Sequence, residues 1–216
     1  MASAIEFSPP PGWDRPELDP VLSLLPAGRL SEIVGSRSSG ATSLLMALLV
    51  RTTAGGRLAA LIDAADAFDP ATASAAGADL GALLWVRCGG RADAALRAVD
   101  LVARCPGFGV VALDLVGLGR RPVVAMGQWV RLARAAEGSG TVLVARTPEH
   151  VTGSAAALVL AVRRVRPRWI GGAQPTRLGG LVSRVEVLRA RGPLGSATTR
   201  PAGAQGDGAM AITWEP

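Results

Sequence analysis

The chain reads Gly35-Ser36-Arg37-Ser38-Ser39-Gly40-Ala41-Thr42 between two apolar runs, and this spacing of glycines and hydroxyl residues predicts a phosphate-binding loop. In a working loop of this kind, a lysine stands directly before the hydroxyl residue and neutralises the terminal phosphates. Here that position is alanine. All 23 basic residues of the chain are arginine, so a bias against lysine would have left arginine at position 41. The sequence therefore predicts a nucleotide-hydrolase fold that has lost efficient hydrolysis.

Strands and helices are expected to alternate outward from this loop. Strand patterns cover 30–34, 58–63, 83–86, 110–114 and 141–145, and helix patterns cover 42–51, 69–77, 91–104 and 123–137. This alternation predicts an α/β fold with a mostly parallel sheet flanked by helices. Two further strands, at 156–163 and 181–189, have no helix between them, so antiparallel strands are expected at the C-terminal edge of the sheet.

Three segments of the chain differ in composition. Residues 1–27 are rich in proline, with a short helix expected near 18–25, and residues 28–192 form the predicted core domain. Residues 193–216 are rich in glycine, alanine and proline, which predicts a flexible tail that is irregular until 209–214.

Composition argues against several kinds of protein. The apolar runs are too short to span a membrane, and the N-terminal residues lack the basic and apolar regions of a secretory signal. We therefore expect a cytoplasmic protein with no membrane partner. Cys88 and Cys105 match no metal or redox spacing and are expected to be reduced. His150 is the single histidine and is expected to be an ordinary loop residue, without a metal.

A carboxylate at the end of a later strand fits the same cleft. Asp114 ends an apolar strand, and the C-terminal ends of parallel strands meet at one edge of the sheet. Gly35, Gly40, Thr42 and Asp114 are therefore the candidate residues of a vestigial nucleotide site, with no catalytic residue and no required cofactor. Weak binding of ATP and Mg²⁺ stays an alternative. A tight strand-to-helix turn that binds nothing explains the same glycines, and the alanine at position 41 favours it.

Positive charge is concentrated in the second half of the chain. Residues 1–114 contain 9 arginines and 12 acidic residues, whereas residues 115–216 contain 14 arginines and 5 acidic residues. The densest cationic segment supplies the candidate residues for binding a nucleic acid or a partner protein: Arg163, Arg164, Arg166, Arg168 and Trp169. Arginine pairs with phosphates and tryptophan stacks on bases, so single-stranded nucleic acid is one candidate. An acidic protein groove and a solvated strand end beside a core tryptophan are the alternatives.

Three segments resemble bacterial RecA recombinases in order and spacing. They are Gly-Arg-Leu-Ser-Glu-Ile-Val-Gly at 28–35, Ser-Ser-Gly-Ala-Thr at 38–42, and Leu-Ile-Asp-Ala-Ala-Asp-Ala-Phe-Asp-Pro at 61–70. The resemblance implies that the glutamate that activates water falls at Ala65, and that the glutamine that senses the γ-phosphate falls near Arg146. The three residues that carry catalysis in the recombinases, a lysine, a glutamate and a glutamine, are thus absent from the corresponding positions of this chain. Their absence argues against a recombination motor.

The short length and the arginine-rich C-terminal half resemble ImuA-type proteins, which are small SOS-induced RecA-like factors. Trp169-Ile-Gly-Gly172 and Leu178-Gly-Gly-Leu181 are similar to their C-terminal pattern. This resemblance implies a non-catalytic adaptor in DNA repair, acting in translesion synthesis and mutagenesis after DNA damage. Its partners would be ImuB, an inactive relative of Y-family polymerases, together with RecA and DNA. Docking on RecA would restrain recombination.

Two other functions remain open. One is a weak, DNA-stimulated ATPase in which Arg37 or another arginine replaces the missing lysine charge. The other is a plain DNA-binding module that depends on the arginines between 163 and 168.

Overall fold

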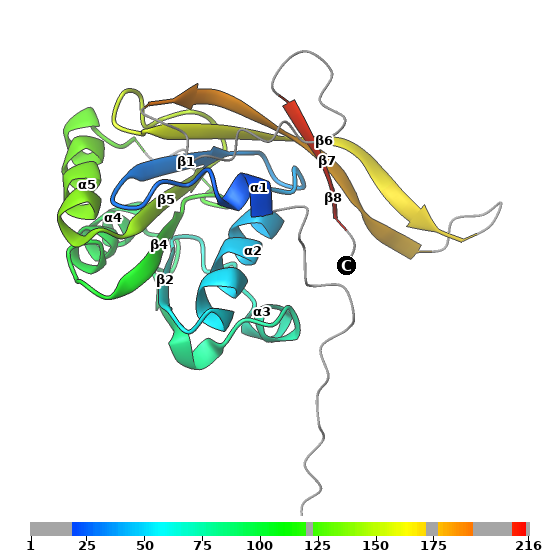
Figure 1. Cartoon of the computed structure of the whole chain (residues 1–216), viewed down its shortest axis with the longest axis horizontal. Helices are drawn as coiled ribbons and strands as arrows, with labels where there is room; N and C mark the ends of the chain where they lie inside the picture. Colours follow the sequence, from blue (N-terminus) through cyan, green and yellow to red (C-terminus); the bar gives the residue numbers. More distant parts are fainter. Residues whose placement is uncertain (1–18, 120–122, 172–176, 192–208, 215–216) are drawn as a thin grey trace, which may run out of the picture.

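A computed structural model describes residues 19–119, 123–171, 177–191 and 209–214. One sheet organises this part of the chain, with eight strands in the order β3-β2-β4-β5-β1-β6-β7-β8 (Figure 1). The strands are β1 (Leu30–Val34), β2 (Leu58–Asp63), β3 (Leu83–Arg87), β4 (Phe108–Asp114), β5 (Val142–Thr147), β6 (Leu158–Ile170), β7 (Arg177–Ala190) and β8 (Ala209–Trp214). Pairing is parallel from β3 through β6 and antiparallel for β6–β7 and β7–β8. The predicted α/β fold with an antiparallel C-terminal edge is confirmed.

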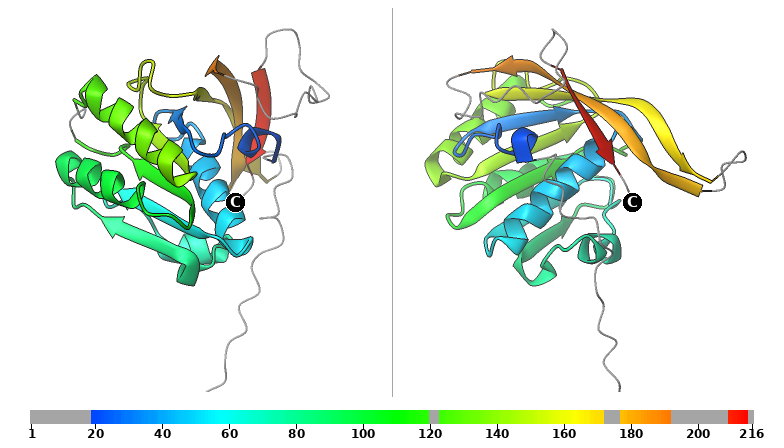
Figure 2. Two further views of the ribbon diagram at one scale, coloured as in Figure 1. Left: turned by 60° about the vertical axis from the view of Figure 1, so that its left-hand side comes forward. Right: turned by 45° about the vertical axis from the view of Figure 1, so that its right-hand side comes forward.

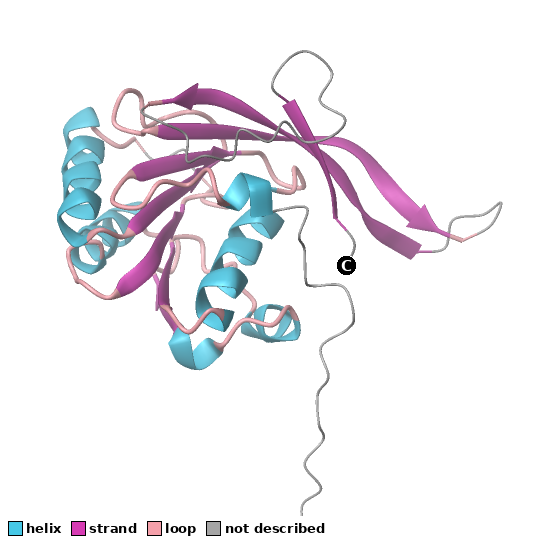
Figure 3. Cartoon of the chain, in the orientation of Figure 1, coloured by secondary structure: helices cyan, strands magenta, loops and turns pink. Residues whose placement is uncertain are grey.

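Helices cover both faces of the parallel strands (Figures 2 and 3). The helices are α1 (Asp19–Leu22), α2 (Ala41–Ala54), α3 (Pro70–Ala75), α4 (Ala92–Val102) and α5 (Met126–Ser139), with a 3-10 turn at Leu80–Ala82. One buried cluster joins α1 and α2 to one sheet face, and a second joins α4 and α5 to the other. Because β4 lies between two strands and under both layers, it is apolar up to its last residue, and it is buried from Gly109 to Asp114.

Two glycines shape the turn from β1 into α2. Gly40 precedes the helix with a φ of 97°, a backbone conformation that glycine adopts readily. A Cβ atom at Gly35 would lie 2.5 Å from Ser39 Oγ and 2.7 Å from Ala41 Cβ, so no larger residue fits there without a shift. The turn therefore requires both glycines, whether or not the loop binds a ligand.

The C-terminal strands are longer than the sequence indicated. Strands were expected at 156–163 and 181–189, whereas β6 and β7 span 13 and 14 residues and form a hairpin that projects beyond the body of the protein (Figure 1). The arginines after residue 162 break the apolar pattern that marks a buried strand, but pairing with β7 continues past them. The predicted tail, 193–216, contains β8, which pairs with β7, so this part of the tail belongs to the sheet. The rest of that tail to residue 208, and most of the predicted segment 1–27, lie outside the described residues.

None of the helices described in the structure has both the length and the apolar character needed to cross a membrane.

Candidate functional site

Two backbone N–H groups of the glycine loop, those of Ser39 and Ala41, are bonded within the loop itself. The Ala41 N–H donates to Ser39 Oγ at 3.2 Å, and Ser39 is buried. In a phosphate-binding loop, backbone N–H groups of this turn point at the ligand. Ser183 of β7 donates in turn to the Ser39 carbonyl oxygen at 2.6 Å, so the loop is also tied to the hairpin.

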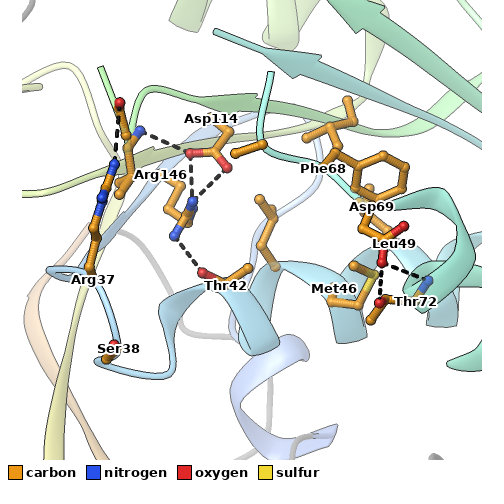
Figure 4. A pocket seen from close by; sticks show the side chains of 15 residues that line it. Arg37, Ser38, Thr42, Met46, Leu49, Phe68, Asp69, Thr72, Asp114 and Arg146 are labelled. Atoms are coloured by element: carbon orange, nitrogen blue, oxygen red, sulfur yellow. Dashed lines mark hydrogen bonds and ion pairs between the residues drawn. The ribbon is translucent and has the colours of Figure 1, made fainter. Parts of the chain in front are cut away.

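Arg146 fills the centre of the predicted nucleotide cleft. It lies on β5 directly beside Asp114 of β4, because these two residues are partners in the parallel register. Its guanidinium donates to both carboxylate oxygens of Asp114, with Nε to Oδ1 at 2.9 Å and NH2 to Oδ2 at 2.6 Å (Figure 4). The third nitrogen, NH1, donates to Thr42 Oγ1 at 2.7 Å. The side chains of Arg146 and Asp114 are only 6% and 12% exposed, so this is a buried, bidentate ion pair.

The electrostatics of this pair differ from those of a metal site. Burial raises the pKa of the Asp114 carboxyl, and the Arg146 guanidinium and the Val116 N–H oppose that rise. In nucleotide hydrolases of this type, the loop hydroxyl and the strand-end aspartate hold Mg²⁺. Here the guanidinium donates to both of those groups. The chain therefore supplies from β5 a cation that bridges the two side chains that a metal would otherwise bridge.

The residues present do not fit a magnesium–nucleotide complex as arranged. Thr42 and Asp114 are engaged by Arg146, and Ala41 brings no charge. Arg37, the candidate replacement for lysine, reaches away from α2 to the Gly117 carbonyl oxygen at 3.5 Å. We therefore derive no reaction step through a bound nucleotide.

The acidic residues near this cleft are also engaged in ion pairs or hydrogen bonds. Ala65 stands at the expected position of the water-activating glutamate, and the next residue, Asp66, pairs with Arg87 of β3 at 2.6 Å. The hydrogen bond from Arg87 lowers the pKa of Asp66. Asp69 caps α3 by accepting from the N–H groups of Ala71 and Thr72.

A pocket of about 320 Å³ lies beside the Arg146 pair, between α2 and the segment that leads into α3 (Figure 4). Its wall is mostly apolar, with Leu45, Met46, Leu49 and Phe68 among its residues. Arg146 and Asp114 reach its edge, but their hydrogen-bonding groups face each other and Thr42. A polyphosphate would therefore find mainly hydrocarbon surface there.

His150 and Glu32 form an anchor that the sequence reading missed. Glu32, on β1, is fully buried, and its carboxylate accepts from Thr147 Oγ1 at 2.8 Å, the Val151 N–H at 2.9 Å and Thr152 Oγ1 at 2.6 Å. His150 Nδ1 lies 2.5 Å from the same carboxylate. His150 is a loop residue, as expected, but it helps to tie the segment after β5 to β1. The signal available in the sequence was an acidic residue inside an otherwise apolar strand.

The cationic candidates lie on β6, away from the Arg146 pair. Arg163, Arg164 and Arg166 are exposed, and Arg163 lies 3.6 Å from Glu186 of β7. Arg168 is in the same strand, but its side chain lies outside the described residues. Trp169 is 55% exposed, so the alternative of a core tryptophan at this position was wrong. The two predicted groups of site residues nevertheless meet at one hollow, because Gly35 of the glycine loop and Arg163 and Arg164 of β6 line it together.

Two further expectations can be compared with the structure. Cys88 and Cys105 are free thiols; Cys88 is buried and Cys105 exposed. Within the described residues, no group of three or more His, Cys, Asp or Glu side chains could hold a metal ion.

Comparison with known proteins agrees with the fold. The model for the RecA N-terminal domain matches residues 18–121. Protein RecA of Chlorobaculum tepidum is 38% identical over 92 residues, which cover 43% of this chain and 26% of that protein. Protein RecA of Thermus aquaticus is 37% identical over 92 residues, covering 43% of this chain and 27% of that protein.

The match thus spans about a quarter of the length of these relatives. The match to the RecA N-terminal domain model, residues 18–121, includes the glycine loop and Asp114 and ends before Arg146 and the hairpin. The chain is therefore similar to the RecA N-terminal domain in the part that carries the loop.

Proposed function

We propose that this chain is a non-catalytic RecA-like adaptor in SOS-induced translesion DNA synthesis. In this role it binds an inactive Y-family polymerase relative of the ImuB type, and it also docks on RecA and restrains recombination. The observation that carries the non-catalytic part is the guanidinium of Arg146, which engages Thr42 and Asp114 together. An enzyme that binds magnesium and ATP in each cycle needs both of these side chains free.

The energetics support an inert cleft. Binding of a magnesium–nucleotide complex would first have to break three hydrogen bonds of a buried ion pair. Separating a buried pair costs about 3–5 kcal/mol. In addition, the missing lysine removes a charged contact that is worth about 1.5–3 kcal/mol. Together these effects reduce nucleotide affinity by several orders of magnitude.

The adaptor part rests on the surfaces that the fold leaves open. The projecting β6–β7 hairpin has no counterpart in the matched RecA segment, which ends at residue 121. At the opposite edge of the sheet lies β3, where Leu84 is exposed. An edge strand can accept a strand from another protein, and this is where we expect RecA to dock.

A DNA-binding module is the second candidate function, favoured by the exposed Arg163, Arg164, Arg166 and Trp169 on one strand. It predicts an affinity for single-stranded DNA that falls steeply with salt. The adaptor predicts that an ImuB-like protein is retained by the chain even where the chain alone binds DNA weakly.

Two measurements test the proposal. Phosphate release by the purified chain, with and without single-stranded DNA, is expected to stay at background. Robust turnover that depends on Thr42 would contradict the non-catalytic part. A pull-down with the full chain is expected to retain an ImuB-like protein, and removal of residues after Gly192 tests whether the last strand contributes. If an excess of the chain leaves strand exchange by RecA unchanged, the proposed docking on RecA is wrong.

A further inference from the structure

The β6 side of the β6–β7 hairpin has an open backbone edge. Strand β1 pairs with β6 only from Leu158 to Ala161, and β1 ends at Val34. On the other side of the hairpin, β8 covers β7 from Leu181 to Glu186. Among the described residues, no strand covers the outer edge of β6 from 163 onward. We call residues 163–166 of β6 the open edge.

A hollow lies at the start of the open edge. Its volume is about 690 Å³, and it is lined by the glycine loop at 35–38, by the segment 148–150 and by β6 at 161–164. It occupies the place in the sheet where β1 would continue if it were longer. A strand entering from outside would therefore find a groove aligned with the sheet.

The positive charge of the open edge indicates which kind of segment would bind there. Arg163, Arg164 and Arg166 are exposed, while Glu186 is the only acidic residue of the hairpin strands. Glu186 lies 3.6 Å from Arg163 and is too distant for a tight pair. A complementary occupant is acidic, because like charges opposite one another in a sheet are destabilising.

The exposed apolar residues at the open edge and its hollow are aliphatic and favour a protein strand, whereas the exposed Trp169 lies beyond the open edge. Val165 is 52% exposed on β6, and Leu188 of β7 lines the hollow and is also 52% exposed. Aliphatic side chains do not stack on bases as aromatic ones do, whereas they pack well against a neighbouring strand. The backbone groups of the open edge that point away from β7 likewise match a strand rather than a phosphodiester, although the register with β7 shifts between Arg164 and Arg166. Pro167 lacks an N–H group and ends the edge.

We propose that the open edge, residues 163–166 of β6, binds an acidic, extended segment of a partner protein as an added β-strand. This inference rests on the proposed adaptor function and names the kind of segment that the partner presents. The added strand takes its affinity from backbone hydrogen bonds, and its selectivity comes from Arg163, Arg164 and Arg166 and from the contact with Val165.

The test uses a fluorescein-labelled synthetic peptide of alternating Glu and Val, with binding followed by fluorescence anisotropy on the full chain. Three probes are compared with it: the same peptide with alternate backbone amides N-methylated, the corresponding Lys–Val peptide, and oligothymidylate. The variant of the open edge, called the arm variant, is Arg163→Glu/Arg164→Glu/Arg166→Glu. The matched control, Arg57→Glu/Arg91→Glu/Arg134→Glu, changes the net charge equally at exposed positions on the body.

The Glu–Val peptide is expected to bind the wild type and the control alike and to bind the arm variant about tenfold more weakly. N-methylation is expected to weaken binding to the wild type by about the same factor, since it removes backbone donors. The Lys–Val peptide is expected to prefer the arm variant. Circular dichroism verifies that both variants are folded.

Three results would each overturn the proposal. The wild type could bind the methylated and unmethylated Glu–Val peptides equally, or the arm and control variants could bind the Glu–Val peptide equally. The third is tighter binding of oligothymidylate than of the Glu–Val peptide. Retention of an ImuB-like protein in a pull-down tests the adaptor function and the open edge separately. If the wild type and the arm variant both retain the ImuB-like protein, the proposed binding at the open edge is wrong and the proposed adaptor function is supported. If neither the wild type nor the control retains it, the adaptor itself is wrong.

Discussion

Replacing Arg146 by methionine removes the guanidinium while keeping most of the hydrocarbon volume. Asp114 is then left buried with one remaining hydrogen bond, from the Val116 N–H, instead of three. Breaking a buried ion pair by removal of one partner costs about 3–5 kcal/mol. For a chain of this length, each kcal/mol lowers the Tm by roughly 2–4 °C, so a decrease of roughly 6–20 °C is expected.

The loss is also expected to depend on pH. Burial already raises the pKa of Asp114, and without Arg146 nothing opposes that rise except the Val116 N–H. A carboxyl whose pKa is raised by folding contributes stability below its unfolded pKa of about 4, and that contribution is lost as pH increases through the folded value. The deficit of the variant is therefore largest at neutral pH and shrinks on acidification.

Urea unfolding at several pH values measures the effect, and a double variant provides the control. Arg146→Met combined with Asp114→Leu removes both charges and is expected to recover most of the lost stability. If the single variant unfolds within about 1 kcal/mol of the wild type at neutral pH, the bridge is not structural and our reasoning about the cleft is refuted. A Tm of the wild type that increases strongly with magnesium and ATP would refute it as well.

Three further predictions concern other parts of the fold. Glu32→Ala leaves several buried donors unsatisfied and is expected to cost about 3 kcal/mol in urea unfolding, whereas Glu32→Gln costs less; equal values would contradict the anchor. Ser183→Ala removes the hydrogen bond to the Ser39 carbonyl and is expected to cost about 1 kcal/mol, so a neutral result would mean that the hairpin does not brace the loop. Iodoacetamide is expected to label Cys105 before Cys88, because Cys88 is buried and burial raises its pKa, which lowers its thiolate fraction at neutral pH; peptide mapping would reveal the reverse order.

Much of the fold followed from local patterns in the sequence. Strands β1 to β5 and the helices between them were predicted because buried parallel strands are continuous apolar runs and α4 and α5 alternate with them. The capped start of α3 at Asp69 and Pro70 was equally visible. These features depend on neighbours along the chain, which a sequence displays directly.

The features that were missed depend on distant residues. Arg146 was read only as a lost glutamine, because its pairing with Asp114 and Thr42 spans 32 and 104 positions along the chain. The length of β6 was underestimated, since arginines on an exposed hairpin carry no apolar periodicity. The joining of β8 to β7 is a long-range pairing that the loose composition of the preceding segment concealed.

The bridge from β5 limits what a single substitution can change in the cleft. Ala41→Lys alone would leave Thr42 and Asp114 held by Arg146, and position 65 would still lack a carboxylate. Replacing Arg146 alone would incur the stability loss worked out above. Building a magnesium site here would therefore require coordinated changes at positions 41, 65 and 146, whereas substitutions of the exposed arginines of the hairpin leave the bridge intact.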